Sequence, residues 1–162
     1  MIIWGELVIV FKFTVTCNAE RLAAVGAMRS ARGCCDGIYF VLDGRLVTDW
    51  GESLGELLIS GHESVLYIGS SKHLDRRTRS LVRAILDPSV RRTVHGFGER
   101  YRTSAHAVGI EHLMVVMIHS PFGFTLEREA FRNAQAKRLD PMGNCRPPGA
   151  TPRYDRFEHR AV

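Results

Sequence analysis

The chain has 162 residues, of which 45% are hydrophobic and 24% charged, and its formal net charge at pH 7 is +5. This composition is that of an ordinary globular protein and excludes a disordered, collagen-like or disulfide-scaffold chain. The length fits one domain with one or two added elements, and a sequence pI near 9.3 favours a polyanionic partner.

The first apolar segment predicts a β-strand over Leu7–Val15. Glu6 and Lys12 interrupt its apolar run and no basic residues precede it, in contrast to a secretory signal peptide. No uncharged apolar stretch reaches the length of a membrane-spanning helix. The cysteines show no metal-ligand spacing, because no Cys-x-x-Cys pair occurs. We therefore expect a soluble, cytoplasmic protein with no membrane partner.

Asn18 is a suitable N-cap for a helix over Ala19–Ala31, which is rich in good helix formers. Three further apolar runs predict buried strands. They are Ile38–Leu42, Val65–Ile68 and Leu113–Ile118. Between the first two runs, Asp43-Gly44 predicts a turn and Leu46-Val47 the start of a return strand. The stretch Asp49–His62 fits either a short helix or an extended excursion.

Leu74, Thr78, Leu81 and Ile85 recur at helical spacing and predict a helix over Lys72–Leu86. We expect Ser70-Ser71 to cap this helix and Asp87-Pro88 to end it. Two further helical segments are expected, the first interrupted by Gly96 and Gly98 and the second capped by Thr125. They are Ser89–Tyr101 and the segment from Thr125 to about Leu139.

This order of elements predicts an α/β or α+β domain. Its centre is a small mixed or antiparallel three-stranded sheet flanked by helices, with an extra strand and helix at the N-terminus. We divide the chain into an N-terminal extension (1–36), a main domain (37–145) and a tail rich in proline and arginine (146–162).

Two tripeptides on predicted strands stand out, Gly37-Ile38-Tyr39 and Tyr67-Ile68-Gly69. Arg77 follows the second on the next helix, Glu127 begins the last helix, and Asn144 closes the segment. In this order the residues resemble the GIY-YIG nuclease family, over about residues 37 to 145. The resemblance implies a metal-dependent endonuclease that hydrolyses DNA phosphodiester bonds.

The resemblance assigns catalytic roles to five residues: Tyr39, Tyr67, Arg77, Glu127 and Asn144. By resemblance, Glu127 holds Mg²⁺ or another divalent cation such as Mn²⁺, and Tyr39, with Tyr67 nearby, orients or deprotonates the attacking water. Arg77 stabilises the developing charge on the phosphate, and Asn144 supports the site. A helical wheel places Arg77 at the edge of the buried stripe and Arg76 outside it, which independently favours Arg77.

The metal ligand has two candidates, Glu127 and Glu129. Glu127 shares a helix face with Ala130, Phe131 and Ala134, whereas Glu129 falls on the opposite face, so the wheel favours Glu127. Glu129 stays an alternative because it stands fifteen residues before Asn144, a separation found in some homing members of the family.

The sequence departs from the family pattern at two places. Tyr39 and Tyr67 are 28 positions apart, so an insertion of roughly Thr48–Glu63 is expected to bulge out between their strands. Leu81 occupies a position where many family members carry His or Tyr. Catalysis then depends on Tyr39 or on another group such as His95, or it is weakened.

The segment from Lys72 to Arg102 has an excess of basic residues, nearly all arginine, as expected of a phosphate-binding surface. Six of them are candidate nucleic-acid contacts: Lys72, Arg76, Arg79, Arg83, Arg91 and Arg92. Besides the nuclease, two alternatives stay open: a catalytically weak nucleic-acid-binding module of the same fold, and an unrelated α/β domain. The sequence leaves open whether the protein is a monomer or a homodimer.

Overall fold

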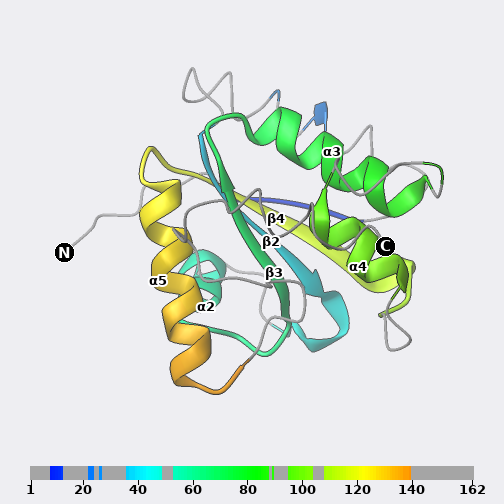
Figure 1. Ribbon diagram of the computed structural model, residues 1–162. Coiled ribbons are helices and arrows are strands. Elements are labelled where there is room, and N and C mark those ends of the chain that lie inside the picture. Colours follow the sequence, from blue (N-terminus) through cyan, green and yellow to red (C-terminus); the bar gives the residue numbers. More distant parts are fainter. Residues whose placement is uncertain are drawn as a thin grey trace, which may run out of the picture.

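In a computed structural model, the chain forms a four-stranded sheet whose two faces are covered by helices (Figure 1). The structure describes residues 8–12, 22–23, 26, 36–48, 53–87, 89, 95–103 and 108–139. The elements follow one another as β1 (Val8–Lys12), β2 (Gly37–Asp43), α2 (Leu54–Ile59), β3 (Val65–Ser71), α3 (Leu74–Leu86), α4 (Gly96–Thr103), β4 (Leu113–His119) and α5 (Gly123–Ala136).

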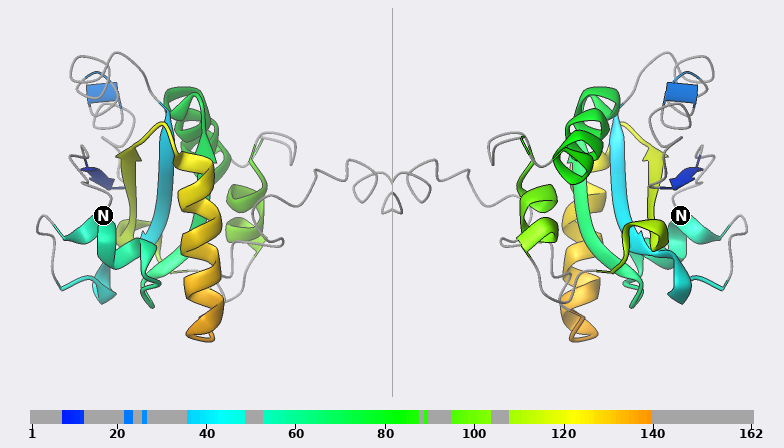
Figure 2. Two further views of the ribbon diagram at one scale, coloured as in Figure 1. Left: turned by 90° about the vertical axis from the view of Figure 1, so that its left-hand side faces the viewer. Right: turned by 90° about the vertical axis from the view of Figure 1, so that its right-hand side faces the viewer.

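The strands pair in the order β1-β4-β2-β3, and every neighbouring pair is antiparallel. The predicted three-stranded centre is confirmed as β4, β2 and β3, within an α+β fold. The extra N-terminal strand is β1, which lies at the edge of the sheet beside β4 (Figure 2). Of the helix expected at Ala19–Ala31, only Leu22, Ala23 and Gly26 are described, and all three are helical.

Strand β2 is buried along its whole length because both faces of the sheet are covered. Ile38, Phe40 and Leu42 face one side, where they pack with residues of α2 and α5. Tyr39 and Val41 face the other side, where α3 and α4 supply the packing partners. Successive residues of a strand point to opposite faces. A strand in the position of β2 therefore requires a continuous apolar sequence.

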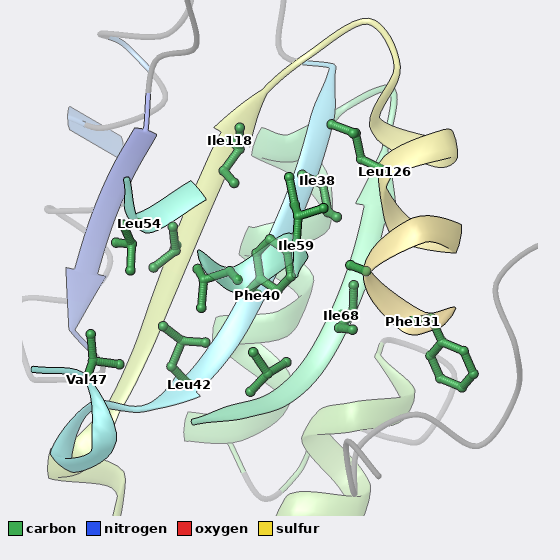
Figure 3. Close-up of a cluster of buried hydrophobic side chains, with 14 residues drawn as sticks. Ile38, Phe40, Leu42, Val47, Leu54, Ile59, Ile68, Ile118, Leu126 and Phe131 are labelled. Carbon is green, nitrogen blue, oxygen red and sulfur yellow. The ribbon is translucent and has the colours of Figure 1, made fainter. Parts of the chain in front are cut away.

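The described part of the segment inserted between the two motif strands, from Ser53 onward, packs against the domain and does not bulge away from it. It contains α2, whose Leu54, Leu58 and Ile59 are buried against the sheet and α5 (Figure 3). The expected return strand at Leu46-Val47 is wrong, because Gly44–Leu46 forms a turn of 3₁₀-helix. The carboxylate of Asp43 fixes this turn by accepting from the backbone and side chain of Arg45.

Two helices begin at residues other than those predicted. β3 extends through Ser71, so α3 begins at Leu74 with His73 as its N-cap, and the Ser71 hydroxyl accepts a hydrogen bond from the His73 amide. Helix α5 begins at Gly123 rather than after Thr125.

The expected interruption at Gly98 is also wrong, since α4 begins at Gly96 and continues through Gly98. A Cβ on Gly98 would stand only 2.5 Å from that of Ala84, so the missing side chain lets α4 pack closely against α3. Within the described ranges no helix has both the length and the apolar character needed to cross a bilayer.

Candidate active site

Four polar side chains meet on the face of the sheet covered by α3 and α4. Arg77 Nε donates a hydrogen bond to the Tyr39 hydroxyl (3.1 Å), and that hydroxyl lies 2.9 Å from Nε2 of His95. The ring of Tyr67 stands beside both, with centroids 5.9 Å from Tyr39 and 5.5 Å from His95. Three residues predicted from the sequence, Tyr39, Tyr67 and Arg77, therefore converge, and His95 joins them.

The two motif glycines explain how the first tyrosine fits. A Cβ on Gly69 would lie 2.6 Å from the hydroxyl and ring carbon of Tyr39, which pairs with Gly69 across β2 and β3. A Cβ on Gly37 would overlap the carbonyl of Ile118 on β4. Each glycine thus allows a close approach that any side chain would prevent.

The two tyrosines differ in how far their side chains are exposed to solvent. The side chain of Tyr39 is 0% exposed, whereas Tyr67 is half-buried at the margin of the apolar cluster. Tyr39 therefore reaches a substrate only through its neighbours Arg77 and Tyr67. Arg77 is itself half-buried, and with Nε committed to Tyr39 its terminal nitrogens are the part that can contact a phosphate.

Burial shifts the ionisation of this group. It raises the pKa of Tyr39 well above 10, so the phenol keeps its proton at neutral pH. Burial, together with the positive charges of Arg77 and Arg100, lowers the pKa of His95 well below its ordinary value. His95 is therefore neutral. Its Nδ1 is buried and has no hydrogen-bond partner in the part of the chain that the structure describes.

Glu127 lies on α5, one turn after the helix begins, and it approaches β3. Its Oε2 accepts a hydrogen bond from the Ser70 hydroxyl at 2.5 Å. Burial raises the pKa of Glu127, while the Ser70 bond and the charge of Arg77 oppose that rise. Arg77 is thus near enough to interact with this carboxylate. Glu129 is exposed on the other side of the helix, as the wheel predicts.

Glu127 is the residue of this site whose carboxylate could hold a divalent cation. Among the described residues no group of three or more His, Cys, Asp or Glu side chains could enclose a metal ion. Mg²⁺ does not require such a group, because it is often held by one or two carboxylates, with water and substrate phosphate completing its coordination. Glu127 with the hydroxyl of Ser70 meets that requirement.

A cleft of about 300 Å³ lies at the end of the sheet where β2 begins and β3 ends. Ser70, the partner of Glu127, forms part of its wall, and residues at the start of α5 close it on the other side. Figure 1 shows the start of α5 and the end of β3 at this same edge of the sheet.

Four of the six residues predicted to contact nucleic acid lie on the described surface, and the other two lie outside the described residues. Lys72, Arg76, Arg79 and Arg83 are all exposed on or just before α3, and Arg79 pairs with Asp75 at 3.0 Å. Arg91, Arg92 and Asn144 lie outside the described residues, as does the tail 146–162.

Sequence reasoning missed Ser70 as a partner of Glu127 and named His95 only as a substitute for Leu81. Leu81 itself is fully buried in the core between α3 and the sheet. The pairing of Ser70 with Glu127 spans 57 positions, and no local pattern signals such a contact. Comparisons with models of protein families, with curated proteins and with solved structures each find no match.

Proposed function

We propose that this protein is a metal-dependent endonuclease of the GIY-YIG type that hydrolyses DNA phosphodiester bonds. The observation that carries the proposal is the meeting of Tyr39, Tyr67 and Arg77 around one hydrogen-bonded hydroxyl, with the charge of Arg77 reaching Glu127. The order of the motifs and the helical wheel point to these residues from the sequence. Their convergence is expected of an active site and is not expected of motifs that match by chance.

Each side chain has a role that its surroundings allow. Arg77 binds a non-bridging oxygen of the scissile phosphate through its terminal nitrogens, and the bond from its Nε to Tyr39 fixes the plane of the guanidinium. Tyr67, the more exposed phenol, orients the attacking water. Tyr39 and His95 lie on the buried side of the site, where they hold Arg77 and Tyr67 in position.

Glu127 is the metal ligand in this proposal, and a bound Mg²⁺ would supply charge neutralisation at the phosphate and the leaving oxygen. Ser70 fixes the orientation of the carboxylate through Oε2. Because burial raises the pKa of Glu127, cleavage should require a pH high enough to ionise it or a cation that stabilises the ionised form.

The test is cleavage of supercoiled plasmid DNA in the presence of Mg²⁺, by the wild type and three variants. Arg77→Ala should reduce the cleavage rate about 100-fold or more, the size of effect seen when a donor to a transition-state charge is removed. Tyr39→Phe should also reduce the rate, because it removes the hydroxyl that accepts from Arg77 Nε and holds the guanidinium in place. Arg76→Ala, assayed at a saturating DNA concentration, is the matched control, since Arg76 is exposed and is assigned to DNA binding rather than to the reaction. It should retain the wild-type rate.

Two results would refute the proposal. One is a preparation of wild type that binds DNA yet never cleaves it with any divalent cation, which would favour the nucleic-acid-binding module instead. The other is unchanged cleavage by Arg77→Ala, which would place the chemistry elsewhere.

A further inference from the structure

One exposed aromatic side chain stands in the wall of the cleft that Ser70 lines. Phe124 is 56% exposed and lines the cleft. Phe122, two residues earlier, is 65% exposed and is not part of the wall. The ring of Phe124 thus presents a flat apolar surface at the mouth of a cleft whose other walls carry charged and hydroxyl side chains.

The remaining wall carries both signs of charge. Lys72 and Asp36 line the cleft together with the hydroxyl-bearing Ser70 and Ser71. A free anion is poorly matched by a wall that includes a carboxylate. A purely apolar ligand is poorly matched by the lysine and the hydroxyls. A nucleotide suits the whole set, because it joins a phosphate, hydrogen-bonding base edges and a flat ring that stacks on an aromatic side chain.

We propose that this cleft receives the base of one unpaired nucleotide, stacked on Phe124, with the adjoining phosphate at Lys72. The inference rests on the proposed function to the extent that DNA is the substrate. A base within an intact duplex cannot enter, because its faces are stacked and its pairing edge is occupied. The protein therefore prefers DNA that carries an unpaired nucleotide.

The position of the cleft connects this base to the cleavage chemistry. Ser70 lines the cleft and donates to Glu127, so a nucleotide held there has its backbone beside the proposed metal ligand. The charge of Arg77 acts on the same carboxylate. The unpaired base then determines which phosphate of the strand lies at the site.

Binding of 2-aminopurine DNA in EDTA tests the inference without cleavage. One duplex carries 2-aminopurine as a single unpaired nucleotide, and the other carries it paired with thymine. The wild type should bind the first about tenfold more tightly, the effect expected of one stacked base, and should quench the fluorescence of the unpaired base. Phe124→Ala should lose both the preference and the quenching while it keeps its affinity for the paired duplex.

Phe122→Ala is the matched control, because it removes a similarly exposed phenylalanine two residues before Phe124 without changing the wall of the cleft. It should retain the preference. Equal affinity of the wild type for the two duplexes would overturn the inference, and so would an undiminished preference in Phe124→Ala. Since EDTA removes the metal, a protein that showed the preference but never cut DNA would refute the nuclease proposal alone.

Discussion

At the scale of single residues, the buried histidine is the group with the clearest physical consequence. His95 is 2% exposed and faces the ring of Tyr67, the hydroxyl of Tyr39 and the charges of Arg77 and Arg100. A positive imidazolium in this place would be both desolvated and repelled by two guanidinium groups. The fold therefore holds His95 in its neutral form.

This neutral histidine should make the stability of the protein depend on pH. Its folded pKa is depressed, so below the ordinary value of 6.5 the unfolded chain binds a proton that the folded chain does not. The free energy of unfolding then falls with decreasing pH, by up to about 1.4 kcal/mol per pH unit for one proton. His95→Gln should lack this part of the slope, as measured by urea unfolding between pH 5 and 8. The other histidines are common to both proteins, so parallel curves would contradict the prediction.

The two glutamates of α5 give a second comparison between residues. Glu127→Gln should lose Mg²⁺-dependent cleavage, because an amide is a poor ligand for the cation, and Glu129→Gln should retain it. The variant that loses cleavage should not be the less stable of the two. The folded pKa of Glu127 is raised, so its ionisation costs stability as pH rises through that value, and the glutamine removes the cost.

Cleavage rate and thermal unfolding, measured on the same preparations, separate these two effects. Loss of activity in Glu129→Gln alone would mean that the exposed face of α5 holds the metal and that the buried carboxylate is structural.

At the scale of elements, strands were easier to predict than helix ends. The apolar runs identified β2, β3 and β4 because a strand covered on both faces has no polar positions to obscure it. The starts of α3 and α5 were misplaced because Ser and Thr are good N-caps in general, whereas here the tertiary structure sets the boundary. Ser71 remains in the sheet, and α5 begins where Gly123 packs against the backbone of Gly37.

The residues of the candidate site could be predicted from the sequence only where they belong to elements with a clear local pattern. Tyr39, Tyr67 and Arg77 belong to strands and a helix with clear periodicity, so the side each one faces follows from its position. Ser70 and Phe124 depend on how α5 meets the end of β3, and His95 depends on how α4 packs on α3. Those are contacts between distant segments, and single-sequence periodicity does not encode them.

The contact between β2 and β3 yields a prediction of its own. Gly69→Ala should displace the ring of Tyr39, since the new Cβ would stand 2.6 Å from it, and should destabilise the fold by about 1–3 kcal/mol, as overpacking of a core does. Cleavage should be lost with it. Gly96→Ala is the control, because its Cβ would meet only the far end of the Arg100 side chain at 3.2 Å. Chemical unfolding in which both variants matched the wild type would contradict this account of the motif glycine.

At the scale of the whole molecule, the basic charge is presented on the outer face of α3. Arg76 and Arg83 are exposed there, while Arg79 is partly neutralised by its ion pair with Asp75. The inner face of the same helix supplies Arg77 to the site. Under the proposed function, one helix carries arginines with two different roles: the outer side chains contact the DNA backbone, and the inner one contacts the reacting phosphate.

Removing the outer arginines should change the salt dependence of DNA binding and leave the chemistry intact. Each phosphate contact releases condensed counterions, so the logarithmic slope of affinity against salt should become shallower by about 0.9 for each arginine lost. Arg76→Ala/Arg83→Ala should therefore flatten the slope by nearly two units on any duplex sequence. The control is Arg128→Ala/Arg132→Ala, which removes two exposed charges from α5, on the opposite face of the sheet. Equal slopes for the wild type and the α3 variant would show that this face is merely solvated, whereas a change confined to the α5 variant would place the DNA across α5.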